Sequence, residues 1–260
     1  MRKYLTIFKI SARNQIVYLP AFLGRNLFFV LVVFIFSALW AAIYSGSELL
    51  AGLTMTQVLW YLTITEVIEL SKTPLYTTIQ EEVKDGTVGY ALTRPYCYII
   101  YYFFSGMGQN LVKMIPMLIE GFLLGVIFAG YLPGYFRAIP YGLLLILGGF
   151  ALVTLWQIII GILAFWFEEV SPFYWILQKL IFIIGGMFFP IDLFPDWLAK
   201  ISRVSPFAFS AYWPAITVVN FSQNNFLTCL AGQLFYCFLL LAAAASLFAA
   251  AVKKVHVQGG

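Results

Sequence analysis

The amino-acid sequence predicts an all-α, polytopic membrane protein, and two observations carry this prediction. Of the 260 residues, 62% are hydrophobic and only 10% are charged, whereas soluble domains carry roughly a quarter charged residues. The apolar residues also gather into stretches of about 20, the length that crosses about 30 Å of hydrocarbon as a helix. Barrel strands would alternate polar and apolar residues over about 10 positions, and the sequence shows no such alternation. We therefore expect one transmembrane domain over residues 1–260.

Six stretches are long and apolar enough to be expected as transmembrane helices. They are Leu27–Tyr44, Leu53–Ser71, Tyr101–Ala129, Ile139–Phe165, Pro172–Phe189 and Leu227–Ala251. An even number of crossings leaves both termini on one side. Ten Lys and Arg residues flank the spans on that side and three on the other, so the positive-inside rule places the N- and C-termini in the cytoplasm. The expected location is the inner, cytoplasmic membrane.

The basic N-terminal segment, residues 1–25, is expected to remain as a cytoplasmic interfacial helix and not to be cleaved as a signal peptide. Over Tyr4–Tyr18 one set of residues recurs at helical spacing, and Lys9 and Arg13 lie outside that set. This pattern predicts an amphipathic helix that lies along the inner headgroups. Pro20 is expected to break the helix before the first span. An irregular basic anchor is the alternative. The recurring residues are Tyr4, Ile7, Phe8, Ser11, Ala12 and Gln15.

The connection between the second and third spans, residues 72–98, is the longest on the cytoplasmic side. Thr78 and Glu81 have the S/T-x-x-E spacing of a capping box, and Gly86 stands where a left-handed residue would end a helix. The pattern predicts a short charged helix over 79–85, a turn at Gly86 and a second short piece. Such an exposed helix is a docking element, and an ordinary solvated loop is the alternative.

The external connection before the last span, residues 190–226, is too long and too apolar for a simple loop. Pro195 suits the start of a helix, and Ser205-Pro206 would end it. A second apolar piece follows over 207–219. Two short helices that enter the outer leaflet as a re-entrant hairpin would satisfy their own backbone groups and serve as a lid. The first helix has an apolar face and a charged face, formed by Trp197, Leu198, Ile201 and Val204 and by Asp196, Lys200 and Arg203.

Five charged residues fall inside the expected spans: Glu66, Glu69, Lys113, Glu120 and Lys179. Because a charge that faces lipid costs several kcal/mol, we expect these residues to face protein or water. Glu66 and Lys179 lie about 8 to 11 Å from the cytoplasmic ends of their helices, which predicts a salt bridge between the second and fifth spans. The alternatives are packing without substrate contact and snorkelling of both side chains to the inner interface.

Small residues recur four apart in the third span, at Gly121, Gly125 and Ala129. This spacing lets another helix approach closely. The Ala-rich end of the last span, residues 242–251, is expected to allow the same kind of close packing.

Motifs for catalysis or nucleotide binding are absent. The sequence has no Gly-Lys dipeptide and so no P-loop, no G-x-S-x-G, and one histidine, His256, in the tail. These absences exclude the common phosphate-binding and nucleophile motifs. Cys97, Cys229 and Cys237 lack CxxC spacing and are expected as small apolar fillers. We expect no enzyme, no metal site, no cofactor on this chain and no nucleic-acid partner.

Two phrases, with the basic N-terminal helix and the six spans, resemble the ABC-2 type permeases of bacterial ABC exporters. The phrases are EVKDGTVGYALTRP at Glu82–Pro95 and GMFFPIDLFPDWL at Gly186–Leu198, the latter followed by Ser205-Pro206-Phe207. The resemblance covers nearly the whole chain and implies the type V exporter fold. It implies that the first phrase is the coupling helix that docks on a separate ATPase, and that the second is the external re-entrant hairpin. The large extracellular domain of some relatives is absent.

The resemblance implies a permease subunit that forms half of a substrate path with a second permease chain, in a homo- or heterodimer. ATP and Mg²⁺ would bind only the partner ABC ATPase subunits. An apolar, aromatic wall suits amphiphilic drugs, as in multidrug efflux, and equally lipids or peptides. The ATPase-docking residues that the resemblance implies are Ile79, Glu82, Val83, Gly86, Thr87, Leu92, Arg94 and Pro95. The corresponding residues of the external hairpin are Pro190, Asp192, Pro195, Trp197 and Pro206.

Two other classes of function remain as alternatives. An ion- or proton-coupled secondary transporter or channel would work without an ATPase, with the intramembrane carboxylates as proton sites. An intramembrane enzyme or an assembly scaffold is disfavoured because the catalytic motifs are missing.

Overall fold

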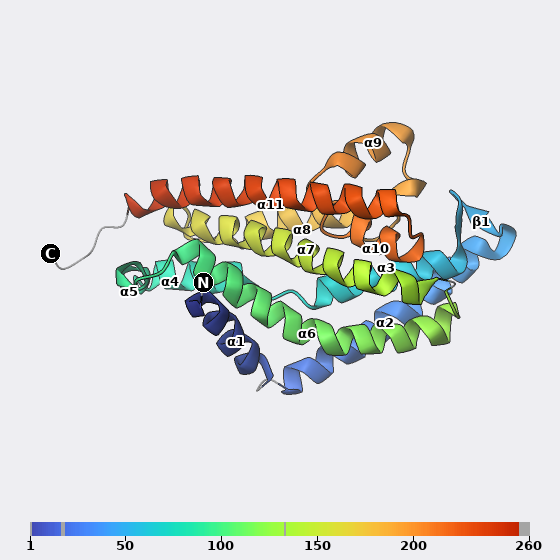
Figure 1. The fold of residues 1–260 in the computed structure, drawn as a ribbon, viewed down its shortest axis with the longest axis horizontal. Coiled ribbons are helices and arrows are strands. Elements are labelled where there is room, and N and C mark those ends of the chain that lie inside the picture. Colours follow the sequence, from blue (N-terminus) through green and yellow to red (C-terminus); the bar gives the residue numbers. More distant parts are fainter. Residues whose placement is uncertain (1, 17–18, 133, 255–260) are drawn as a thin grey trace.

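Helices form most of the described chain, and most of them run along one long axis (Figure 1). The computed structural model describes residues 2–16, 19–132 and 134–254. Helices occupy all six expected spans: α2 (Leu19–Ile43), α3 (Met55–Leu70), α6 (Tyr98–Ala129), α7 (Tyr135–Ile162), α8 (Ser171–Ile183) and α11 (Gln223–Val252). The other helices are α1 (Arg2–Ile16), α4 (Leu75–Lys84), α5 (Val88–Thr93), α9 (Asp196–Val204) and α10 (Tyr212–Val219). The short elements are η1 (Tyr44–Gly46), η2 (Leu163–Phe165), η3 (Ile191–Leu193) and the strands β1 (Leu49–Leu50) and β2 (Leu53–Thr54).

Within the described residues, four helices are long and apolar enough to cross a membrane. Their apolar stretches are Gly24–Gly46, Tyr98–Ala129, Arg137–Phe165 and Gln223–Val252. With 16 residues in α3 and 13 in α8, these two helices reach only about 24 and 20 Å, short of the hydrocarbon thickness of about 30 Å. The chain is thus an all-α polytopic membrane protein, in which two of the six expected spans are short helices.

The predicted end of the fifth span is wrong. Helix α8 ends at Ile183, because Gly185 and Gly186 follow and Gly186 has a left-handed φ of 73°. A Cβ at Gly186 would also lie 2.7 Å from Ile191. The chain therefore turns here into the connection before the last span.

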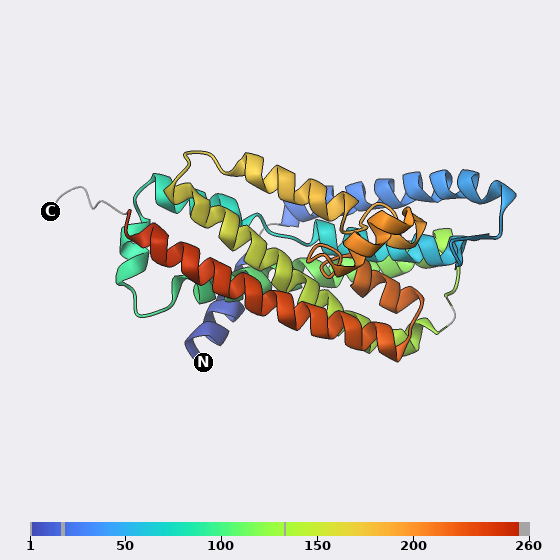
Figure 2. The ribbon, with the colours of Figure 1, turned by 90° about the horizontal axis from the view of Figure 1, so that it is seen from above.

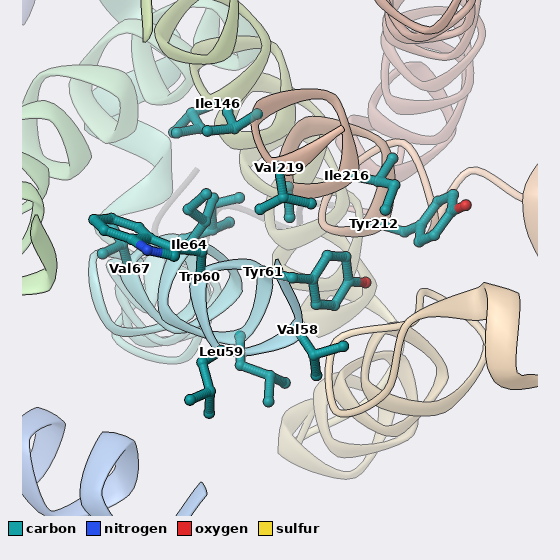
Figure 3. Close-up of a cluster of buried hydrophobic side chains, with 14 of the residues drawn as sticks. Val58, Leu59, Trp60, Tyr61, Ile64, Val67, Ile146, Tyr212, Ile216 and Val219 are labelled. Atoms are coloured by element: carbon teal, nitrogen blue, oxygen red, sulfur yellow. The ribbon is translucent and has the colours of Figure 1, made fainter. Parts of the chain in front are cut away.

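Helix α3 lies at the centre of the main apolar core. Residues 58–68 are all buried, because α2, α6 and α10 pack around this helix. In Figure 3, Tyr61 of α3 lies beside Tyr212 of α10, and the two ring centroids are 6.1 Å apart. Trp60 extends from α3 on another side, away from Tyr61 and Tyr212 in this view. A helix that is covered all round needs no separate polar face, which explains why the apolar residues of α3 are spread around the whole helix.

The predicted close approach along the small residues of α6 is confirmed. A Cβ at Gly121 would lie 3.1 Å from Val67, and one at Gly125 would lie 2.7 Å from the ring of Trp60. Helices α3 and α6 thus pack at a separation that only glycine permits at residue 125.

A second layer is built on α7, which packs against α4, α10 and α11. Helix α11 runs beside α7 in both ribbon views (Figures 1 and 2). The Gln233 side chain of α11 is buried and donates to the carbonyl oxygens of Leu145, at 2.7 Å, and Phe209, at 3.0 Å. This amide joins α11 to α7 and to the segment before α10.

The N-terminal helix is present, but its packing differs from the prediction. The residues expected to lie against the headgroups pack on α6 instead, as the Ser11–Ser105 hydrogen bond of 2.9 Å and the stacking of Tyr4 on Phe104 show. The predicted end of the helix at Tyr18 lies outside the described residues. Pro20 stands in the first turn of α2, where its missing N–H costs nothing.

The predicted capping box at Thr78 is wrong. Helix α4 begins at Leu75, after Pro74, so Thr78 lies inside the helix and caps nothing. The box is found instead at the start of α3, where Thr54 accepts from the amide of Gln57 and the Gln57 side chain accepts from the amide of Thr54. Just before it, β1 and β2 form a hairpin whose turn places Ala51 and Gly52 at φ 49° and 80°, a feature that the sequence analysis missed.

The connection predicted to be external, residues 190–226, does contain two short helices, α9 and α10. Helix α10 is buried against α7 and α3. Helix α9 rests on its small residues Ala199 and Ser202, and Trp197, Ile201 and Val204 of its apolar face are exposed. The predicted division of α9 into two faces is confirmed, with the apolar face turned away from the rest of the chain.

Candidate functional site

The segment predicted to dock an ATPase forms two short helices, α4 and α5, at one end of the molecule (Figure 1). We call residues 75–95 the α4–α5 segment. Leu75, Tyr76, Ile79 and Gln80 form the buried face of α4, which packs against α7. Ile79 is fully buried, and a Cβ at Gly161 would lie 2.7 Å from its side chain. The prediction that Ile79 contacts another subunit is therefore wrong, because this side chain anchors α4 within the chain.

Two amides from neighbouring helices bind the backbone where α3 turns into α4. The N–H of Thr73 donates to Asn110 of α6 at 2.9 Å, and the N–H of Leu75 donates to Gln157 of α7 at 2.7 Å. Both amide side chains are buried. Non-helical backbone buried among apolar helices must find such partners. These bonds fix the start of α4 relative to α6 and α7.

The α7–α8 connection holds the other side of α4. The backbone N–H of Val170 donates to Gln80 at 2.8 Å, and the Gln80 amide donates to Glu169 at 3.3 Å. Lys84, at the end of α4, forms an ion pair with Glu169 at 3.3 Å. Hydrogen bonds from the Ser171 hydroxyl and amide, and then Lys84, lower the pKa of Glu169 to about 2. The Glu169 carboxylate is therefore charged at neutral pH and joins α4 to this connection.

A left-handed glycine turns the chain from α4 into α5, as predicted. Gly86 has a φ of 71° and no atom within 4 Å of its would-be Cβ, so conformation and not space requires glycine here. The Thr87 hydroxyl donates to the Glu82 carbonyl at 3.3 Å across the turn. Gly86, Thr87 and Tyr90 are exposed, the last at 75%. The turn and α5 thus form a protruding ridge on a firmly held helix.

The remaining predicted docking residues lie around this ridge. Arg94 and Pro95 are exposed, and Glu82, Val83 and Leu92 are half-buried. Glu82 accepts from the Tyr98 hydroxyl at 3.0 Å, and the Arg94 guanidinium donates to the Tyr96 hydroxyl at 3.3 Å.

A cavity of about 270 Å³ opens beside α5. Five tyrosines line it, among them Tyr90 and Tyr98, together with Glu82 and Arg94. The Glu82 carboxylate and the Arg94 guanidinium give the cavity one negative and one positive group. The α4–α5 segment therefore presents aromatic, acidic and basic groups at one surface.

The charged residues of the expected spans do not pair as predicted. Among the described residues Glu66 is buried and accepts no hydrogen bond, and the Lys179 ammonium lies 5.2 Å from the ring centroid of Phe182. The predicted Glu66–Lys179 bridge is therefore wrong. Glu69 makes the contact between α3 and α8 instead, since it accepts from Gln178 at 3.1 Å and pairs with Lys72.

Lys113 and Glu120 of α6 have different surroundings. The Lys113 ammonium donates to the Thr73 hydroxyl at 2.7 Å, close to the α3–α4 turn. Within the described part of the chain, one buried carboxylate oxygen of Glu120 lacks a partner. Lys113 thus adds to the bonds that hold the turn, whereas Glu120 does not.

An aspartate closes the segment that was predicted to be the external hairpin. Asp192 accepts from Arg203 at 2.9 Å and from the Tyr212 hydroxyl at 3.0 Å, so it joins η3, α9 and α10. For the other predicted residues of this region only the exposure is informative. Pro190 is buried, Pro206 is half-buried, and Pro195 and Trp197 are exposed.

Four polar residues that position α4 were not predicted from the sequence, namely Asn110, Gln157, Gln80 and Glu169. For Asn110 and Gln157 a signal was available, because uncharged amides inside apolar spans are expected to bond between helices. Of the cysteines, Cys229 is buried as expected, whereas Cys97 is exposed and fills no core. In the described chain no three His, Cys, Asp or Glu residues cluster as metal ligands would.

Comparison with known proteins identifies the family. The sequence model of the family described as ABC-2 family transporter protein matches residues 13–259. Comparisons with curated proteins and with solved structures give no match. Because the family match spans the six span helices, the α4–α5 segment and the external hairpin, this chain belongs to the ABC-2 family of transporter proteins.

Proposed function

We propose that this chain is the permease subunit of an ATP-driven exporter and that its α4–α5 segment docks a separate ABC ATPase. The observation that carries the proposal is the exposed ridge at Gly86, Thr87 and Tyr90 on a helix whose other side is fixed to α7. A docking element that moves a transmembrane core must be exposed on one side and rigidly held on the other. Membership of the ABC-2 family supports this role.

All six span helices cross the membrane in this proposal. Helices α3 and α8 are short, but each is followed by buried, non-helical residues, such as Ser71 and Met187. Irregular backbone is tolerated at membrane depth where protein covers it. The excess of Lys and Arg at the end that carries α1 and the α4–α5 segment supports a cytoplasmic location for that end.

A second permease chain, identical or different, completes the substrate path. Helices α2 and α8 expose many large apolar side chains, such as Leu27, Phe34, Trp175 and Ile176, and a second chain would cover part of this surface. The path then runs between α2 and α8 of the two chains. An apolar wall with few charges suits an amphiphilic cargo such as a drug, a lipid or a peptide, while ATP and Mg²⁺ bind the partner.

The ATPase supplies the energy by moving α4. Closure of the ATPase dimer would push the ridge, and the bonds of Asn110 and Gln157 to the start of α4 would pass this movement to α6 and α7. No step needs a nucleotide site on this chain.

A secondary transporter is the second candidate, and one observation favours it. Within the described residues Glu66 accepts no hydrogen bond, and Glu120 has one unpartnered buried oxygen. A buried carboxylate without partners is a candidate proton site.

Transport by proteoliposomes separates the two candidates. Vesicles would contain this chain with or without a candidate ABC ATPase subunit, and uptake of a labelled amphiphile would be followed with ATP or with a pH gradient. Uptake only with both the ATPase and ATP supports the proposal. Uptake by the chain alone, driven by the pH gradient, would overturn it.

A matched pair of glycines tests the role of the ridge in the same vesicles. Gly86→Ala forces a side chain into the left-handed region, at a cost of roughly 1–2 kcal/mol, whereas Gly89 has an ordinary φ and free space. We expect Gly86→Ala to uncouple ATP hydrolysis from transport and Gly89→Ala to leave coupling intact. Equal effects would argue against a coupling role for the turn.

A further inference from the structure

The outer surface of α1 carries a row of cations. Arg2, Lys9 and Arg13 are exposed and are separated by 7 and 4 residues, so they share one face of the helix. This face is opposite the residues that pack on α6. Helix α1 contains no Asp or Glu, and in the described chain none of the three cations forms a salt bridge. We call these three residues the basic row.

Large apolar side chains border the basic row. Leu5 is 53% exposed, Ile10 is 54% exposed and Ile16 is 67% exposed. Cations next to exposed aliphatic side chains are typical of a helix that lies in a membrane interface. The outer surface of α1 therefore has the composition of a lipid-binding face, although the face predicted from the sequence for this purpose packs on protein.

Because of the position of α1 along α6, its outer face would contact lipid and not a soluble partner. Helix α1 bonds to Ser105 and Gln109, which lie about 10 to 17 Å along α6 from its first residue, Tyr98. At this position α1 lies beside a membrane-spanning helix and away from the ridge at Gly86. A surface that is basic and apolar at this depth meets phospholipid headgroups and the upper parts of their chains.

Helix α1 is also bonded to the linker between α5 and α6. The Lys3 ammonium donates to the carbonyl of Pro95 at 2.6 Å, and the Tyr4 hydroxyl accepts from the backbone N–H of Cys97 at 3.0 Å. The Tyr4 ring stacks on Phe104 with centroids 5.7 Å apart. Whatever holds α1 in place therefore also holds the end of the α4–α5 segment.

We propose that the basic row is a binding surface for anionic phospholipid headgroups, and that a bound lipid steadies the linker 94–97 through Lys3 and Tyr4. The inference needs no ATPase and stands apart from the proposed transport function. Each cation near an anionic surface contributes about 1 kcal/mol, or about fivefold in affinity.

Lipid binding is measured on the full chain by thermal unfolding in a neutral detergent. Short-chain phosphatidylglycerol should raise the Tm in a saturable manner, because a ligand of the folded state stabilises it. Phosphatidylcholine of the same chain length should not. The double variant Lys9→Gln/Arg13→Gln should lower the affinity for phosphatidylglycerol by about 25-fold, from about fivefold per cation. A matched control, Lys253→Gln/Lys254→Gln, removes two exposed cations elsewhere and should leave the affinity unchanged.

Glycerol 3-phosphate provides the anionic group without acyl chains. It should give no shift, and an equal Tm shift with it would overturn the assignment to lipid. An equal loss of affinity in the Lys253→Gln/Lys254→Gln control would overturn the assignment to α1.

Hydrogen exchange tests the connection to the linker. Phosphatidylglycerol should slow exchange of the Cys97 amide in the unmodified chain. Tyr4→Phe keeps the ring on Phe104 but loses the hydroxyl acceptor, so it should abolish this protection while lipid still raises the Tm. Unchanged exchange at Cys97 on lipid addition to the unmodified chain would refute the steadying of the linker.

Discussion

Ile79 of α4 packs against Gly161 of α7 so closely that residue 161 has no room for a side chain. A Cβ at Gly161 would lie 2.7 Å from the Cβ of Ile79 and 2.9 Å from two further carbons of the same side chain. Contacts this short do not occur between real side chains, so a larger residue must displace α4. The position of the proposed docking helix is therefore set by a glycine that is distant from it in the sequence.

Substitution of Gly161 should destabilise the chain in proportion to side-chain size. Gly161→Ala is expected to cost about 1–3 kcal/mol through overpacking, and Gly161→Leu more. Thermal unfolding in detergent measures both. Gly24 has no atom within 4 Å of its would-be Cβ, so the same substitutions at Gly24 should have little effect, and equal losses at both glycines would contradict the packing described.

Ile79→Ala distinguishes an anchor from a docking residue. As an anchor, Ile79 loses buried contacts, and the isolated chain should be destabilised by about 2–5 kcal/mol. A residue used only to contact an ATPase would leave the unfolding temperature of the isolated chain unchanged.

Removal of either amide at the α3–α4 turn should weaken the bonding of the backbone there. Asn110→Leu removes the acceptor of the Thr73 N–H, at a cost of about 1–3 kcal/mol. After Gln157→Leu the Leu75 N–H keeps its bond to the Thr73 carbonyl oxygen at 2.9 Å, so the loss should be smaller. Hydrogen exchange at these amides should accelerate together with the loss of stability. Asn224→Leu, on the exposed start of α11, is the control, and a loss of equal size there would show that the turn needs no such support.

The external hairpin should depend more on Asp192 than on Arg203. Asp192→Ala removes the acceptor of the buried Tyr212, at a cost of about 1–3 kcal/mol, whereas Arg203→Gln breaks only an exposed ion pair worth about 0–1 kcal/mol. Hydrogen exchange over residues 190–212 should therefore rise clearly in Asp192→Ala and little in Arg203→Gln. The reverse order would mean that the ion pair and not the tyrosine closes the hairpin.

The contact between Glu169 and α4 should survive mild acidification. The ordinary pKa of a glutamate is about 4.3, and hydrogen bonds from Ser171 lower that of Glu169 to about 2. The stabilising contribution is complete above the unfolded value and is lost as the pH falls through about 2. A carboxyl ¹³C NMR titration should show this low pKa, with a larger upward shift in Ser171→Ala than in Lys84→Gln. A titration near 4.3 in the unmodified chain would disprove the bonding described.

Features set by local sequence could be predicted from the sequence. Features that depend on how a helix is rotated about its axis, or on contacts between residues far apart in the chain, could not. Gly86 in its left-handed turn and the glycines of α6 follow from short-range rules and were predicted correctly. Glu66 and Lys179 are expected at the same depth in the membrane, but equal depth does not determine whether their side chains point toward each other. In the structure Glu69 and Gln178 face each other instead. A change of one residue turns a side chain by about 100°, which is enough to select a different pair.

The two errors at helix ends have a related cause. The Thr78–Glu81 spacing matches a capping box, but Gln157 of α7 satisfies the N–H of Leu75 and allows α4 to start earlier. The sequence does not show that a side chain 82 residues away supplies this cap. Likewise, the apolar residues after Ile183 continue the pattern of a span, although Gly185-Gly186 allows the chain to turn and pack on other helices.

Site-specific crosslinking tests the docking role of the α4–α5 segment most directly. In a Cys97→Ser background, Tyr90→Cys would place a thiol on the ridge, and Leu49→Cys would place one at the opposite end of the molecule, where β1 lies (Figure 1). Each variant would be coexpressed with a candidate ABC ATPase that co-purifies with this chain and would be treated with a short bifunctional reagent. We predict a crosslink to the ATPase from Tyr90→Cys and none from Leu49→Cys. A crosslink from Leu49→Cys, or a stable complex that gives none from Tyr90→Cys, would contradict ATPase docking at this ridge.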